Sequence, residues 1–171
     1  MAPVRVLIYL LRRDLRISDN LVFHELSTKK DHGFTHLLPL FVFAAQQVEV
    51  KGFIPDPATK SPYPEARSQV GGFWRTGPHR ARFLAESVWD LKNRLGRVGS
   101  GLCIRVGLVH DVISIIIDHI NKASDAKVGG VWMAGEEGVE EGREELQVKK
   151  VCRNLGAEFK LWPDEKYLID E

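Results

Sequence analysis

The chain alternates short apolar runs with segments of helical periodicity, and this alternation limits its fold more than any other feature. Strands are expected at Val4–Leu11, His36–Phe43, Gly101–Gly107, Gly129–Gly135 and Ala157–Pro163. Helices are expected at Asp19–Lys29, His79–Leu95, His110–Ile120 and Glu136–Leu155. This order predicts an α/β fold, a three-layer Rossmann-like domain in which a five-stranded parallel sheet carries helices on both faces.

One long segment interrupts the alternation. Residues 44–78 show no regular pattern, and the stretch FIPDPATKSPYP inside them has four prolines in twelve residues. Proline removes a backbone donor and fixes φ, so this stretch is excluded from helices and central strands. We expect one domain over residues 1–171 with a long insertion loop at 44–78, and the start of a linker in the last eight residues.

The first expected strand leads directly into the charged segment RRDLRISDN, residues 12–20. In an open parallel sheet, ligands bind outside the carboxyl ends of the strands, which is where this segment lies. Arginine can bind phosphate or carboxylate through two parallel hydrogen bonds. Arg13 and Asp14 are therefore candidate cofactor-binding residues. The alternative is that Asp14 pairs with Arg13 or Arg16 and only fixes the turn or an interdomain face. The expected N-cap of the following helix is Ser18 or Asp19.

Composition excludes several functions. A net charge of +1 gives the whole chain no general attraction to nucleic acid or anionic membranes. No apolar run approaches the roughly 20 residues of a membrane-spanning helix. The two isolated cysteines, Cys103 and Cys152, cannot build a structural zinc site and indicate a reducing compartment. We expect an intracellular protein, and the sequence does not distinguish nucleus, cytoplasm and mitochondrion. We expect no metal site and no catalytic residue in this chain.

The segment LIYLLRRDLRISDN resembles the opening strand and turn of the photolyase/cryptochrome family, through Arg12, Asp14, Leu15, Arg16, Asp19 and Asn20. LLPLFVF resembles the family's second strand. The stretch from Trp74 to Gly107 is similar to the DASH branch of the cryptochromes, and SPYPEARSQVG resembles the form seen in fungal members. The chain is therefore identified as the N-terminal α/β domain of a DASH-type cryptochrome from a fungus.

This resemblance implies a function in a longer protein. In the family, an FAD-binding helical domain follows the α/β domain. We expect this helical domain to be absent from the chain. In the full-length protein, it would pack against the α/β domain. The full-length protein would serve blue-light photoreception, or repair pyrimidine dimers in DNA as a photolyase, a carbon–carbon lyase. FAD and DNA would be bound only in that context, and the chain alone would not be catalytic.

The resemblance also implies an antenna pocket, which in DASH proteins usually holds 5,10-methenyltetrahydrofolate. An acidic residue at the start of the last helix contacts the pterin there. The matching stretch is EEGVEEGREEL, in which Glu140 is the best positional match and Glu141 the second. A carboxylate can accept two hydrogen bonds from an aminopterin edge. Every glutamate of this stretch except Glu140 has a second interpretation as part of a solvated acidic face, opposed only by Arg143.

Two other functions are consistent with the residues. The first is a self-standing Rossmann-like nucleotide-binding domain, which would bind a nucleotide tightly as an isolated chain. The second is a cofactor-free protein-interaction module that works through the glutamate stripe or the proline-rich loop. It would bind no chromophore and would have a salt-sensitive protein partner.

Overall fold

The computed structural model describes residues 4–29, 31–50, 56, 58–123 and 125–163. The strands are β1 (Val4–Leu11), β2 (His36–Ala44), β3 (Cys103–Gly107), β4 (Ala126–Ala134) and β5 (Glu158–Trp162). The helices are α1 (Leu21–Thr28), α2 (Pro78–Arg97), α3 (Val109–Asn121) and α4 (Val139–Asn154). The expected linker start, residues 164–171, lies outside the described residues.

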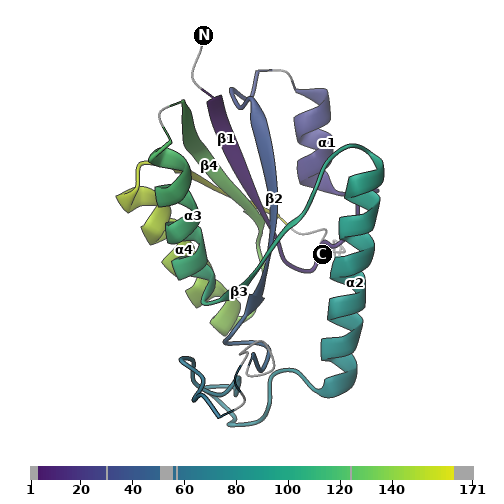
Figure 1. Cartoon of the computed structure of the whole chain (residues 1–171), viewed down its shortest axis with the longest axis vertical. Helices are drawn as coiled ribbons and strands as arrows, with labels where there is room; N and C mark the ends of the chain where they lie inside the picture. The colour runs from purple at the N-terminus through teal and green to yellow at the C-terminus, as the bar shows by residue number, and fades with distance from the viewer. Residues whose placement is uncertain (1–3, 30, 51–55, 57, 124, 164–171) are drawn as a thin grey trace, which may run out of the picture.

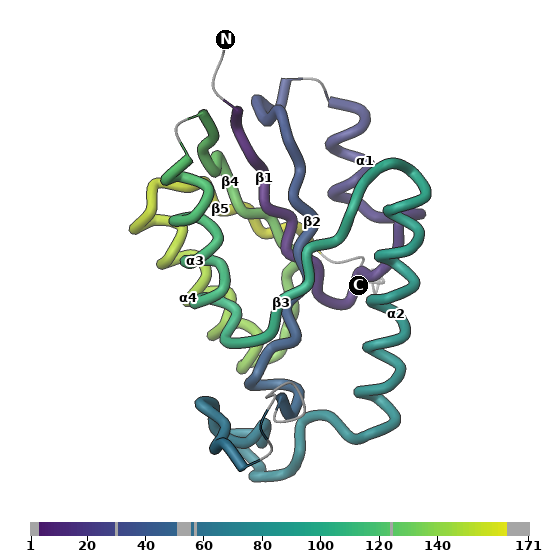
Figure 2. The backbone as a smooth tube through the Cα atoms, in the orientation of Figure 1, coloured from purple at the N-terminus to yellow at the C-terminus, as the bar shows by residue number. Residues whose placement is uncertain are grey.

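All neighbouring strands of the sheet are parallel, in the order β3-β2-β1-β4-β5 (Figure 2). Strand β1 is central, with β2 on one side and β4 on the other. The chain winds outward from β1 to β3 and then returns to β4, so the strand order reverses between β1 and β4. The carboxyl ends of these two strands form the position at which open α/β sheets bind ligands.

Helices cover both faces of the sheet, as Figure 1 shows, which confirms the predicted fold class. Strand β1 alternates between the two cores because successive side chains of a strand point to opposite faces. Leu7, Tyr9 and Leu11 pack with residues of α1 and α2. Ile8 and Leu10 pack with residues of α3 and α4. This arrangement explains why the β1 sequence is apolar without alternation.

The largest differences from the predicted element boundaries are at the starts of α4 and β4. Helix α4 begins at Val139 rather than at Glu136, with Gly138 as its N-cap. Glu136 therefore belongs to the β4–α4 connection and not to the helix. Its side chain pairs with Arg12 and Arg13. Strand β4 begins at Ala126, three residues before the predicted start.

The insertion loop lies beyond the carboxyl ends of the strands, at the lower end of Figure 1. Between β2 and α2, the described residues contain no helix or strand, and one isolated antiparallel bridge joins Arg67 to Trp74. The loop is thus placed next to the edge of the sheet at which a ligand would bind. None of the described helices is long and apolar enough to cross a membrane.

The turn before α1 is fixed by Asn20, not by Ser18 or Asp19, so the predicted N-cap is wrong. The Asn20 side-chain oxygen accepts a hydrogen bond from the Phe23 amide at 3.0 Å. The Asn20 amide nitrogen donates to the Tyr9 hydroxyl at 2.8 Å. Asp19 adopts a φ of 57°, a left-handed conformation that asparagine and aspartate tolerate better than other non-glycine residues. Asn20 therefore joins the cap of α1 to the core strand.

We predict that Asn20→Ala lowers the free energy of unfolding by about 1–2 kcal/mol, because an N-cap and a buried partner of Tyr9 are lost together. Ser18→Ala, at an exposed position two residues earlier, is the control and should change it by less than about 0.5 kcal/mol. Urea denaturation followed by circular dichroism measures both. A larger loss in Ser18→Ala would contradict the assignment of the cap.

Candidate functional site

The candidate site lies where β1 and β4 end side by side. Arg12 and Arg13 follow β1 directly, and Gly135 and Glu136 follow β4. Helix α4 begins a few residues later and brings Glu140, Glu141, Glu144 and Glu145 to the same edge. The topology therefore brings the basic end of one strand to the acidic start of a helix more than 120 residues away.

Asp14 is bound within the turn. One carboxylate oxygen accepts a hydrogen bond from the Arg12 amide at 3.0 Å, and the other accepts one from the Tyr9 hydroxyl. Burial, followed by the adjacent Asp14 charge, raises the pKa of Tyr9, so this phenol stays protonated and remains a donor. Asp14 thus fixes the turn, as one of the two alternatives predicted, but through Tyr9 and the Arg12 backbone.

Arg12 is buried among three carboxylates. Its Nε lies 3.3 Å from Glu136, its Nη2 lies 3.1 Å from Glu144 and its Nη1 lies 2.7 Å from Glu145. The Arg12 side chain is 8% exposed and that of Glu144 is 5% exposed. Glu145 also accepts a hydrogen bond from the Glu136 amide at 2.8 Å. One guanidinium thereby holds the end of β1, the β4–α4 connection and the first half of α4 together.

The surroundings raise the pKa of two of these carboxylates. Burial is the largest cause that raises the pKa of Glu136, and the Arg12 and Arg13 charges oppose it. Burial likewise raises the pKa of Glu144 against the opposing charge of Arg12. A single arginine does not fully compensate the desolvation of several carboxylates.

A second set of ion pairs surrounds Glu140 and Glu141. Arg75, from the insertion loop, lies 2.9 Å from Glu140 and 2.6 Å from Glu141. Glu140 also accepts hydrogen bonds from the Gln69 amide at 2.9 Å and from the Ser68 hydroxyl at 3.3 Å. Arg13 lies 2.9 Å from Glu136 and 3.9 Å from Glu141. The start of α4 is thus joined to both the β1 turn and the insertion loop.

A pocket of about 210 Å³ opens beside these ion pairs. Arg13, Glu140 and Glu141, which are three of the four predicted binding residues, line it. The remaining lining residues are Gln47, Ser68, Phe73, Arg75, Thr76 and Arg80. Asp14 does not line this pocket; it lines a cavity of about 30 Å³ with Tyr9 and Asn20. The structure therefore brings together Arg13, Glu140 and Glu141, and separates Asp14 from them.

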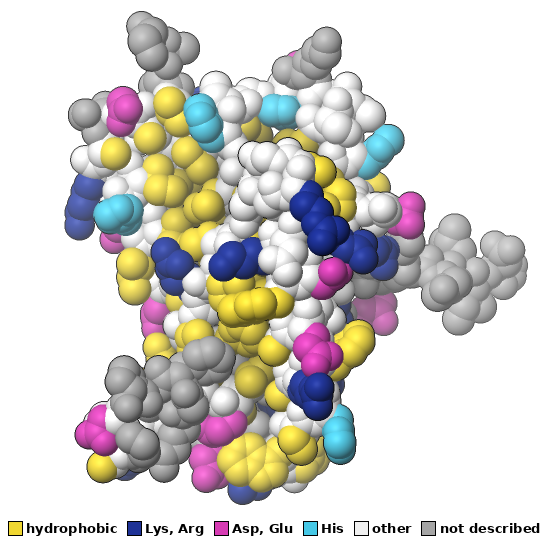
Figure 3. All heavy atoms as spheres, turned by 45° about the vertical axis from the view of Figure 1, so that its right-hand side comes forward, with side chains coloured by type: hydrophobic (Ala, Val, Ile, Leu, Met, Phe, Trp, Pro, Cys, Tyr) yellow, Lys and Arg dark blue, Asp and Glu magenta, His cyan; other side chains and the backbone are white. Residues whose placement is uncertain are grey.

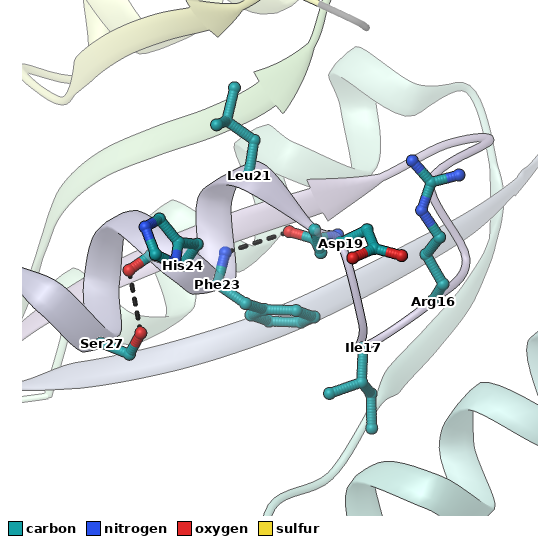
Figure 4. A pocket seen from close by; sticks show the side chains of 8 residues that line it. Arg16, Ile17, Asp19, Leu21, Phe23, His24 and Ser27 are labelled. Carbon is teal, nitrogen blue, oxygen red and sulfur yellow. Dashed lines mark hydrogen bonds between the residues drawn. The ribbon is translucent and has the colours of Figure 1, made fainter.

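A larger and more open hollow lies elsewhere on the described surface. It has a volume of about 810 Å³ and lies along the turn before α1, where Arg16, Asp19 and His24 contribute to its lining. Figure 4 shows Ile17 and Phe23 projecting to one side of this segment and Leu21 to the other. None of the four predicted binding residues lines it.

The surface in Figure 3 carries Lys and Arg side chains next to Asp and Glu, with apolar patches between them. On α2, Arg82 pairs with Glu86 and Arg94 pairs with Asp90, each at 2.8 Å. This mixture of charges on the face shown agrees with the net charge of +1. Among the described residues, no group of three or more His, Cys, Asp or Glu side chains could hold a metal ion.

The predicted solvated acidic face is wrong for most of its members. Glu144 is buried, and Glu136, Glu141 and Glu145 have side chains that are 9%, 12% and 12% exposed. The opposing cations are Arg12, Arg13 and Arg75, whereas Arg143 donates to Gln69 at 3.0 Å. Sequence reasoning missed Arg12 and Arg75 as partners of these glutamates because both arginines are distant in the chain. The only available signal was the unusual density of glutamate at the ligand edge.

Comparison with known proteins shows which family the chain is similar to. The family model described as DNA photolyase matches residues 7–170. The chain is 51% identical over 172 residues to a protein of Neurospora crassa named cryptochrome DASH, mitochondrial, covering 100% of this chain and 23% of that protein. It is 48% identical over 171 residues to a cryptochrome DASH of Gibberella zeae, covering 100% of this chain and 24% of that protein. The chain thus spans about a quarter of the length of these relatives.

Solved structures show the same fold. A cryptochrome of Synechocystis superposes with a TM-score of 0.69 at 27% identity, covering 95% of this chain and 28% of that one. A photolyase of Sulfolobus tokodaii superposes with a TM-score of 0.63 at 22% identity, covering 93% of this chain and 29% of that one. The Sulfolobus photolyase structure contains two FAD molecules, which imply a novel light-harvesting cofactor in that protein.

We predict that Arg12→Met lowers the free energy of unfolding by about 3–5 kcal/mol, because it leaves three buried carboxylates without their common cation. The control is Arg13→Met, whose side chain is 63% exposed and whose loss should cost less than about 1 kcal/mol. Chemical denaturation at neutral pH measures both. Equal losses in the two variants would contradict a central role for the Arg12 cluster.

The raised pKa values of Glu136 and Glu144 predict a pH dependence of stability. A carboxyl whose pKa is higher in the folded state than its ordinary value of 4.5 binds protons more tightly when folded. The resulting stabilisation is fully present below that ordinary value and is lost as the pH rises through the folded-state pKa. As the pH falls from neutral toward that ordinary value, the free energy of unfolding should therefore rise more steeply in the wild type than in Glu144→Gln. Parallel slopes in denaturation series would contradict the assignment.

Proposed function

This chain belongs to the DNA photolyase family, and we propose that it is an antenna domain that binds a folate chromophore at the carboxyl edge of its sheet. The observation that carries the proposal is the convergence of Arg13, Glu140 and Glu141 on one pocket. All three residues were predicted from the sequence as binding residues. They come from two segments far apart in the chain, the turn after β1 and the start of α4. In the full-length protein the chromophore, which we propose to be 5,10-methenyltetrahydrofolate, would absorb light and pass excitation to FAD.

The residues of the pocket fit such a ligand in their chemistry. A pterin presents N–H donors along one edge, and carboxylates accept such donors. Oε2 of Glu141 accepts no hydrogen bond from a described residue, so it has acceptor capacity left for a ligand. Three arginines line the pocket against two glutamates, which gives it an excess of positive charge. That excess suits the carboxylates of a folate tail.

The size of the pocket supports binding with a partner. Its volume of about 210 Å³ lies below the roughly 300–1,000 Å³ of most small-molecule sites. We therefore propose that this chain supplies the recognition edge and that an FAD-binding helical domain supplies a further wall. The relatives named cryptochrome DASH are about four times as long as the part matched here, which leaves room for such a domain.

The activity of the whole protein follows from the family. We propose blue-light photoreception or photorepair of DNA, with FAD and DNA bound in the full-length protein and no catalytic residue in this chain. We also propose an intracellular location. The Neurospora relative is named mitochondrial, so the mitochondrion is the first compartment to test. Microscopy of the tagged full-length protein would test it.

The rival functions have less support. An interaction module working through the glutamate stripe would need exposed carboxylates, yet the side chains of Glu136, Glu144 and Glu145 turn inward to Arg12. A self-standing nucleotide-binding domain would use the same sheet edge, but the first turn has no glycine-rich phosphate loop.

An absorption titration of the purified chain with methenyltetrahydrofolate tests the proposal. We expect saturable binding with a shifted folate band, weakened about tenfold or more in Glu141→Gln and Glu140→Gln because an ionised acceptor is replaced by an amide. Glu158→Gln, an exposed glutamate of β5, is the matched control and should bind like the wild type. FAD is a second probe, chosen because the Sulfolobus photolyase carries two FAD molecules.

Each outcome has a distinct meaning. Binding of FAD in place of the folate would replace the proposed ligand with a flavin. Failure of the wild-type chain to bind either chromophore, or equal binding by all variants, would overturn the proposed site.

A further inference from the structure

One wall of the proposed pocket comes from the insertion loop, where the family resemblance named no residue. Ala66 to Arg75 form a short hairpin. The Ser68 amide donates to the Phe73 carbonyl at 2.9 Å, and the Arg75 amide donates to the Ala66 carbonyl at 3.0 Å. Ala66 is buried, so the hairpin is anchored at its base. It therefore presents its tip residues in a defined position.

Polar contacts fix this hairpin against α4. Glu140 accepts hydrogen bonds from the Gln69 amide and the Ser68 hydroxyl, and Arg143 donates to the Gln69 side chain at 3.0 Å. Arg75 reaches both Glu140 and Glu141. The position of the hairpin is thus set relative to the same two carboxylates that would accept the edge of a ligand.

The two aromatic rings of the hairpin differ in their availability. The Trp74 ring is covered by the Arg67 guanidinium, whose central carbon lies 4.1 Å from the ring centroid. The Phe73 side chain lines the pocket and is 64% exposed. A Cβ atom at Gly71 would collide with the Phe73 ring, so the glycine lets the ring lie against the hairpin backbone. The apolar Phe73 ring is therefore exposed at the pocket, beside Glu140 and Glu141.

We infer that Phe73 is a specificity-determining residue of this pocket, whose ring stacks on a planar conjugated ligand while Glu140 and Glu141 accept hydrogen bonds from the ligand's edge. The ligand class is a flat heteroaromatic ring with N–H donors on one edge and an anionic tail. This inference rests on the proposed function and deepens it. The insertion loop is then a functional part of the site, since it selects conjugated rings over other anionic ligands.

The test compares four variants of the chain in the same absorption titration with methenyltetrahydrofolate. Phe73→Leu keeps an apolar side chain and removes the π face, and should weaken binding about five- to tenfold. Gly71→Ala keeps Phe73 and displaces its ring, and should weaken binding to a similar degree. Phe73→Tyr restores a ring and should bind within about twofold of the wild type. Val70→Ala is the control, because Val70 is at the tip of the same hairpin, is 84% exposed and does not line the pocket.

Induced circular dichroism in the folate band gives a second readout, because a stacked ring orients the chromophore whereas a purely structural role leaves the band shape unchanged. We expect this signal to fall in Phe73→Leu and Gly71→Ala and to return in Phe73→Tyr. Unchanged affinity and circular dichroism in Phe73→Leu, with binding still weakened in Glu141→Gln, would overturn the role of Phe73 and leave the proposed function standing. Absence of binding by the wild-type chain would overturn both.

Discussion

The ion pairs of Arg12 with Glu136, Glu144 and Glu145 are the interaction on which the edge of this sheet depends. The arginine leaves the central strand at its carboxyl end, and the three carboxylates arrive from the connection after β4 and from α4. Burying these charges is unfavourable in itself, which is why the pKa values of Glu136 and Glu144 are raised. The cluster therefore contributes less to net stability than to a defined position of α4 relative to β1.

That position determines the geometry of the proposed pocket. Because Arg12 holds the first half of α4 against β1, Glu140 and Glu141 extend toward the insertion loop, where Arg75 meets them. Arg13, the neighbour of Arg12, also reaches Glu136, and it lines the pocket. Two adjacent arginines thus have separate roles: one is buried and positions a helix, and the other is exposed at the pocket.

The insertion loop is part of this arrangement. A loop of more than 30 residues in a chain of 171 residues is costly to order, and such loops are usually functional or disordered. Its 66–75 hairpin is ordered by contacts to the two glutamates that a ligand would use. Ligand binding at the proposed site and the position of this hairpin would therefore stabilise each other.

The sequence by itself determined the fold class and most of the element order, because apolar runs and helical periodicity report burial locally. The strand pattern of β1 and the apolar stripe of α2 needed no knowledge of the rest of the chain. The sequence also placed Arg13 near the ligand edge through its position after the first strand, and Glu140 and Glu141 through a family resemblance. Only the tertiary structure decided which charges meet. Arg12 and its carboxylates are far apart in the chain, as are Arg75 and Glu141, and ion pairing depends on distance in space. For the same reason, most of the glutamates predicted on a solvated helix face are turned inward. Asp14 accepts a hydrogen bond from Tyr9 and does not line the pocket.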